Sequence, residues 1–94
     1  MTVHGREAIE AEIGQILLEQ WDPLGVREAP GRSYGEYAPY AHEVYSLLAR
    51  GASDVQIARR LHQAEQDELH HPELVTRDLT PVVRALRALE PRLL

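Results

Sequence analysis

The sequence predicts an all-α fold: a single-domain bundle of four helices over about residues 6–20, 38–50, 54–69 and 81–90. Apolar residues recur at spacings of three and four, the period of an amphipathic helix. No stretch alternates apolar and polar residues over the length of a strand. A chain of 94 residues is long enough to bury about two thirds of the surface of its unfolded form. We therefore expect residues 1–94 to form one helical domain.

The first predicted helix, residues 6–20, leads into the hexapeptide Trp-Asp-Pro-Leu-Gly-Val at residues 21–26. Because the ring of Pro23 biases Asp22 out of the α region, the helix should end there. Gly25 can supply the positive φ of a turn, which leaves Leu24 and Val26 free to fold back on the core. The apolar stripe comprises Ile9, Ile13, Ile16, Leu17 and Trp21. We expect a structural anchor with a buried indole, formed by Trp21, Asp22, Pro23 and Gly25; the alternative is an exposed recognition loop.

Residues 27–36 carry one proline and two glycines without apolar periodicity, so a loop is expected. The helix at 38–50 follows, with Pro39 in its first turn and Gly51 as its C-terminal cap. Its inward-facing residues should be Tyr37, Tyr40, Val44, Leu47 and Leu48.

The third predicted helix, residues 54–69, starts at a capping box formed by Ser53 and Gln56. Asp54 adds favourable charge to the same helix end. Pro72 prevents a simple continuation, so His70-His71-Pro72 should be a break. The inward-facing residues should be Ile57, Ala58, Leu61, Ala64 and Leu69.

The last predicted helix, residues 81–90, has Thr80 as its N-cap and Pro81 in the next position. Pro91 should end it. A short turn is expected at 73–75 within the poorly patterned stretch 70–80. The inward-facing residues should be Val82, Val83, Leu86 and Leu89.

The net charge of −5 is concentrated in the first half of the chain. Residues 1–48 carry eight acidic and three basic residues, whereas residues 49–94 carry seven of each. A nucleic-acid-binding protein needs a basic surface to neutralise phosphates, so this balance argues against one. It suits a protein that meets a basic protein partner.

The absence of cysteine excludes disulfides, thiol nucleophiles and zinc–thiolate sites. No apolar run approaches the roughly 18 residues of a membrane span, and no leader peptide is recognisable at the start. No serine lies in a nucleophile motif, and no glycine-rich phosphate loop follows a strand. We expect a cytoplasmic protein that is not an enzyme and needs no cofactor.

Residues 48–61 resemble the opening of bacterial helix-turn-helix domains, in which a Gly-x-Ser start precedes an Ile-Ala-x-x-Leu helix. A basic recognition helix should follow a tight turn there. Instead the helical pattern continues through Glu65, Asp67 and Glu68, which phosphates would repel. DNA binding is kept as an alternative function.

A metal-binding helical bundle is a second alternative. Glu68 and His71 have the i, i+3 spacing of ligands in carboxylate-bridged metal sites, and His62 lies on the same helix. Such a site draws a second Glu-x-x-His pair from another helix, which this sequence lacks. The simpler interpretation is a solvated acidic helix end with histidines near its C-terminal dipole.

Four of the five aromatic residues are tyrosines within a short stretch, at Tyr34, Tyr37, Tyr40 and Tyr45. Tyrosine buries a ring while its hydroxyl stays hydrated, and it is common at protein interfaces. These rings could pack on the bundle, or they could form a protein-binding face with the acidic residues nearby. For the second case we expect the contacts to be Arg27, Arg32, Tyr34, Glu36, Tyr37 and Glu43.

Residues 16–26, together with 37–40, 43–48, 51–53 and 57–58, resemble a family of small bacterial helical proteins of unknown function. That family has a Trp-Asp-Pro-x-Gly-Val signature and a later helix that starts Gly-Ala-Ser-x-x-x-Ile. The resemblance covers about residues 9–65, implies an all-α domain and brings no catalytic residues. Small acidic proteins of this kind include immunity and antitoxin factors. We therefore expect an immunity-like or accessory factor that binds another protein; homo-oligomerisation is left open.

Overall fold

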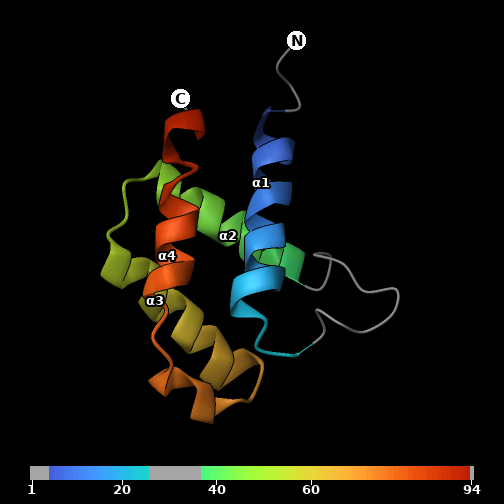
Figure 1. Ribbon diagram of the computed structural model, residues 1–94, viewed down its shortest axis with the longest axis vertical. Helices are drawn as coiled ribbons and strands as arrows, with labels where there is room; N and C mark the ends of the chain where they lie inside the picture. The colour runs from blue at the N-terminus through green and yellow to red at the C-terminus, as the bar shows by residue number, and fades with distance from the viewer. Residues whose placement is uncertain (1–4, 26–36, 94) are drawn as a thin grey trace.

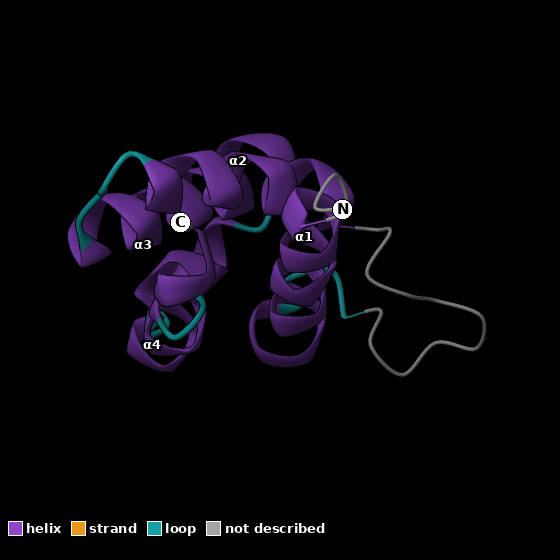
Figure 2. Cartoon of the chain, turned by 90° about the horizontal axis from the view of Figure 1, so that it is seen from above, coloured by secondary structure: helices purple, strands orange, loops and turns teal. Residues whose placement is uncertain are grey.

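The computed structural model describes residues 5–25 and 37–93, and it confirms the all-α fold. Within these ranges there are four α-helices and no strand: α1 (Gly5–Ile16), α2 (Ala38–Ala49), α3 (Asp54–Gln63) and α4 (Thr80–Arg87). Helix α4 lies between α1 and α3, and α2 passes behind α1 and α4 (Figure 1). Figure 2 shows from above that α2 and α3 lie on the same side of α4. No described helix has the length and apolar character of a membrane span.

Two helices continue beyond their α-helical part in a wider, π-helical turn. These turns are η1 (Leu17–Trp21) after α1 and η3 (Ala64–Glu68) after α3. Asp22 N donates to Leu17 O at 2.8 Å, and Leu69 N donates to Ala64 O at 2.8 Å. The predicted helices at 6–20 and 54–69 are therefore present but are not α-helical throughout. π turns occur often at functional sites.

The connection between α2 and α3 follows the predicted capping chemistry. Gly51 has a φ of +77°, and the backbone after it folds back so that Ala52 N donates to Leu47 O at 2.9 Å. This is the hydrogen bond of a Schellman cap. Ser53 Oγ accepts from Gln56 N at 3.2 Å, and Gln56 Oε1 accepts from Ser53 N at 2.7 Å. Both predicted caps are confirmed.

The start and end of the last helix differ from the prediction. Thr80 is the first helical residue instead of the N-cap, and its N–H donates to Asp78 Oδ1 at 2.9 Å. The helix ends at Arg87, and Glu90–Leu93 (η5) forms a separate 3-10 turn. Since Pro91 has no N–H, it cannot donate to the carbonyl one α turn earlier, so the α-helix cannot extend to residue 90. The predicted turn at 73–75 is present as the 3-10 turn η4 (Pro72–Thr76).

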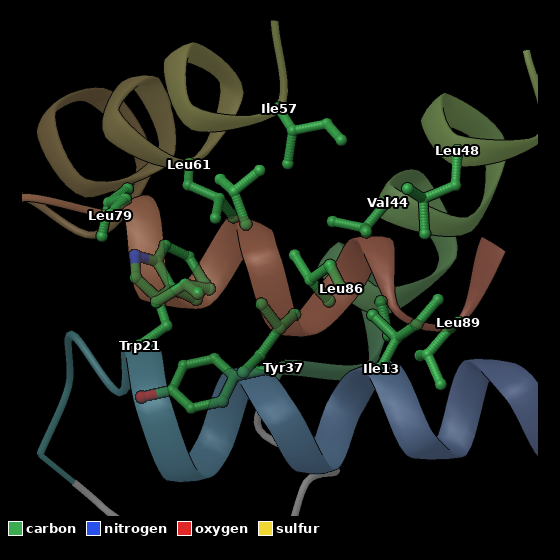
Figure 3. Close-up of a cluster of buried hydrophobic side chains, with 14 of the residues drawn as sticks. Ile13, Trp21, Tyr37, Val44, Leu48, Ile57, Leu61, Leu79, Leu86 and Leu89 are labelled. Carbon is green, nitrogen blue, oxygen red and sulfur yellow. The ribbon is translucent and has the colours of Figure 1, made fainter. Parts of the chain in front are cut away.

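The core lies where the faces of all four helices meet (Figure 3). The inward-facing positions predicted for the last helix are all buried, and so are most of those predicted for the other helices. Trp21 is 1% exposed, and its ring centroid lies 5.5 Å from that of Tyr37. Leu24 does not fold back on the core as predicted, since it is 38% exposed. The buried hydrophobic residues are Ile9, Ile13, Leu17, Leu18, Trp21, Tyr37, Ala41, Val44, Leu48, Ala52, Ile57, Leu61, Ala64, Leu79, Val82, Val83, Leu86 and Leu89.

Candidate functional site

A carboxylate is buried at the junction of α3, η1 and the segment before α4. Glu65, in η3, has no solvent exposure. Trp21 Nε1 donates to its Oε2 at 2.7 Å, and His62 Nδ1 lies 2.8 Å from its Oε1. Arg77 Nη2 donates to Oε2 at 3.2 Å. Because three N–H donors converge on it, the carboxylate is tolerated in the core.

This finding corrects the expectation of a solvated acidic helix end at Glu65, whereas Asp67 and Glu68 are exposed as expected. Glu65 follows Leu61 by four residues and so continues the inward face of α3. Arg77 Nη2 also donates to Trp21 O at 3.0 Å, which satisfies a carbonyl at the end of the first helix. The buried carboxylate and the arginine together join three separate parts of the chain.

A second polar cluster holds the turn after Trp21. Asp22 has a φ of +37° and Gly25 a φ of +67°, and Gly25 N donates to Asp22 O at 3.1 Å. The hydroxyl of Tyr37 donates to Asp22 Oδ1 at 2.7 Å and accepts from Leu24 N at 3.1 Å. Pro23 is buried beside them. The start of α2 is thereby tied to the end of the first helix.

Most of the residues predicted to contact a partner lie outside the described part of the chain. These are Arg27, Arg32, Tyr34 and Glu36. Tyr37 is fully buried, which corrects its expected place on a binding surface. Its ring packs on Trp21, and its hydroxyl makes hydrogen bonds with Asp22 and Leu24 in the turn.

Glu43 is half-exposed and is held within the molecule by Arg60. The arginine donates to Glu43 from Nε at 3.1 Å and from Nη2 at 2.7 Å. Arg60 Nη2 also lies 3.1 Å from Glu68 Oε2. The pKa of Arg60 is raised above its ordinary value, mainly by its hydrogen bond to Glu43. Glu43 is therefore one partner of a structural ion pair between α2 and α3.

The three residues considered as metal ligands have separate partners. His62 pairs with Glu65, Glu68 pairs with Arg60, and His71 Nδ1 lies 3.1 Å from Glu73 Oε2. Over residues 5–25 and 37–93, no three acidic or histidine side chains converge as a metal site would require.

An open groove of about 490 Å³ lies between α3 and α4. We call it the α3–α4 groove. Its apolar lining comes from Ala58, Leu79 and Val83, of which the last two are buried. Val55, on the first turn of α3, also lines it and is 61% exposed. The polar lining residues are Asp54, His62, Arg77, Asp78, Thr80, Arg84 and Arg87.

The charged side chains of the groove differ in how far they are already paired. Arg87 donates to Asp54 at 2.7 Å and to Glu90 at 2.6 Å. Arg84 makes no hydrogen bond or ion pair with any described residue. The pKa of Asp78 is lowered mainly by hydrogen bonds from the side chain and backbone of Thr80, and the charge of Arg84 is a minor cause of that carboxyl's lowered pKa. Arg84 is therefore the basic group of the groove that is still available to a ligand.

The sequence patterns did not single out the groove residues or the buried network. Spacing alone could have indicated Glu65, because Ile57, Leu61 and Glu65 follow one another at intervals of four. Arg77 carries no comparable signal, since it lies in the irregular backbone between η4 and α4. Val55 and Arg84 look like ordinary surface residues of their helices until α3 and α4 are placed side by side.

No protein family model, no curated protein and no solved structure matches this chain. The resemblance to small bacterial helical proteins therefore stays a prediction. The case for function rests on the geometry of the α3–α4 groove.

Proposed function

We propose that this chain is a protein-binding domain without enzymatic activity, and that the α3–α4 groove is its binding surface. The exposure of Val55 is the observation that supports the proposal most directly. Val55 is the large hydrophobic side chain most exposed to water among the described residues, at 61% against 38% for Leu24, and it stands beside an apolar depression. Exposed apolar surface rimmed by polar groups is typical of interaction sites.

The dimensions and lining of the groove support a protein ligand. A groove of about 490 Å³ is large enough to take apolar side chains presented by one face of a short segment. Arginine, which lines it at three positions, is enriched at protein interfaces. The two flanking helices are fixed by the core, so the groove is formed before a ligand arrives.

The contacts of Glu65 and His62 support a binding role and not a catalytic one. Glu65 accepts three hydrogen bonds and has no exposed surface. His62 uses Nδ1 to hold that carboxylate. The contacts from Trp21 and Arg77 join Glu65 to other parts of the fold, as expected of a group that positions helices.

A second candidate is the immunity-like role, in which an acidic face covers a basic partner. It is favoured by a hollow between α1 and α2 that is lined by Glu7, Glu10 and three alanines. Glu10 already accepts from Arg6 at 2.7 Å, so the hollow is partly neutralised. If this face binds the partner, Glu7→Gln should weaken binding of a basic protein, whereas substitutions in the α3–α4 groove should not.

The proposed function is tested with a phage-displayed library of random peptides selected on the whole, immobilised chain. Selected peptides are synthesised and titrated into the isotope-labelled protein, and NMR shift changes should map to α3 and α4. Val55→Asp should weaken their binding about tenfold or more, because a buried apolar contact is replaced by a charge.

Leu24→Asp is the matched control, since Leu24 is the other large exposed hydrophobic residue and lies outside the groove. Both variants should keep the circular dichroism spectrum and melting temperature of the wild type. Peptides that shift signals elsewhere, or that bind Val55→Asp and the wild type equally, would overturn the proposal.

A further inference from the structure

We infer that the α3–α4 groove takes a peptide segment that places a carboxylate on Arg84 and an apolar side chain against Val55 and Val83. The inference rests on the proposed function, and it specifies the chemistry of the partner. It also reverses the expectation of a basic partner, because the charged side chain of this groove that has no hydrogen bond or ion pair with the described residues is an arginine.

Some charged side chains of the groove are already paired within the fold, and others are not. Arg87 is neutralised by Asp54 and Glu90, at 2.7 and 2.6 Å. Arg77 is paired with the buried carboxylate of Glu65 at 3.2 Å. These groups hold α3, α4 and the first helix together, so they have little to offer a ligand.

Two further charges remain in the lining, on Arg84 and Asp78. Asp78 accepts the N–H of Thr80 at the start of α4, where the helix dipole favours a negative charge. Arg84 is exposed and has no hydrogen bond or ion pair with the described residues. A guanidinium offers paired N–H donors that match a carboxylate. Arg84 is therefore the natural contact for an acidic group.

The position of Arg84 links the charge to the apolar lining. Thr80, Arg84 and Arg87 follow one another along one face of α4, and Val83 adjoins Arg84 on the side that lines the groove. Val55 faces α4 from the first turn of α3. A segment whose carboxylate meets Arg84 thus brings a neighbouring apolar side chain to Val83 and Val55.

His62 leaves one ring nitrogen open to the groove, and because Nδ1 donates to Glu65, Nε2 of the neutral ring is an acceptor for an N–H or O–H of the ligand. Its Nδ1 is committed to Glu65, and its Nε2 makes no hydrogen bond with any described residue. Nε2 is not a buried atom that lacks a partner. It is therefore in contact with solvent where His62 lines the groove. A basic segment would meet the charge of Arg84, whereas Asp54 is paired with Arg87 and Asp78 accepts from Thr80.

The experiment uses peptides from the library selection that bind the groove, measured by fluorescence anisotropy against the whole chain. The selected sequences should combine an aspartate, a glutamate or a free C-terminus with a large apolar residue. Replacing the acidic residue by its amide should weaken binding about tenfold. Amidation of the C-terminus distinguishes a terminal carboxylate from a side-chain one.

Two variants of the protein should act in opposite directions. Arg84→Gln should weaken binding about tenfold, because it removes the ligand's charged partner. Asp78→Asn keeps the oxygen that accepts from Thr80 and removes only the repulsive charge, so it should strengthen binding about twofold to threefold. Arg50→Gln, an exposed arginine that does not line the groove, should leave the affinity unchanged.

The outcomes separate this inference from the proposed function. Groove-binding peptides that lack acidic groups and are indifferent to Arg84→Gln would overturn the inference and leave the binding surface established. Basic peptides, with affinities that rise in Arg84→Gln and fall in Asp78→Asn, would also overturn it. A selection that yields no ligand for the groove overturns the proposed function, and this inference with it.

Discussion

Replacing Glu65 with alanine tests the buried network directly. The substitution removes the acceptor of Trp21 Nε1, His62 Nδ1 and Arg77 Nη2. It also leaves an empty space in the core at a side chain with no exposure. We expect the free energy of unfolding to fall by about 3–5 kcal/mol, the range for removing one partner of a buried ion pair.

The magnitude follows from how each donor can respond. Trp21 is 1% exposed, so its N–H is left without an acceptor, at a cost of about 1–3 kcal/mol. The side chains of His62 and Arg77 are 26% and 37% exposed and can turn to water, so each loses only a modest net hydrogen bond of about 1 kcal/mol. Loss of one buried methylene adds about 0.8 kcal/mol.

The assay is urea denaturation followed by circular dichroism, with Glu68→Ala as the control. Glu68 lies three residues later, is 42% exposed, and pairs with Arg60 on the surface. Its replacement should cost no more than about 1 kcal/mol. A loss of 3–5 kcal/mol corresponds to a melting temperature lower by more than about 12 °C. If the two variants unfold at the same urea concentration, the buried network described above is wrong.

Two further predictions concern the polar groups around the helix ends. Tyr37→Phe removes the hydroxyl that bridges Asp22 and Leu24, so it should lower the free energy of unfolding by about 1–2 kcal/mol; an unchanged urea midpoint would contradict this role. The pKa of Asp78 is lowered, mainly by hydrogen bonds from Thr80, so its ionised form stabilises the fold above the pKa of the unfolded chain, about pH 4. The stability gap between the wild type and Asp78→Asn should therefore close as the pH falls below about 4, and a gap that stays constant down to pH 2 would refute the assignment.

The helices could be predicted because their signals are local. The spacing of apolar residues gave the inward faces, and Gly51 and the Ser53–Gln56 pair marked boundaries that the structure confirms. The π turns could not be predicted in the same way. Their wider hydrogen bonds have no residue preference of their own, and they follow from the burial of Trp21 and Glu65, whose contact joins residues 44 apart.

The candidate site depends even more on tertiary structure. Val55 and Arg84 are unremarkable in the sequence, since each is a common residue on an exposed helix face. Their significance arises because α3 and α4 pack with the groove between them. The predicted partner contacts instead followed the tyrosines, of which Tyr37 is taken up by the core. Packing thus decided which polar and aromatic residues remained available for binding.

The hydrogen bond from Arg77 to the carbonyl of Trp21 has a consequence for synthesis on the ribosome. It joins residues 56 positions apart, and the contact of Trp21 with Glu65 spans 44. Because the chain emerges from its N-terminus, the first helix leaves the ribosome long before the groups that hold its end. Nascent chains that stop short of residue 77 lack the hydrogen bond from Arg77 to Trp21. Such chains should be cleaved by protease near Trp21, and resistance to cleavage should appear only once Arg77 has emerged.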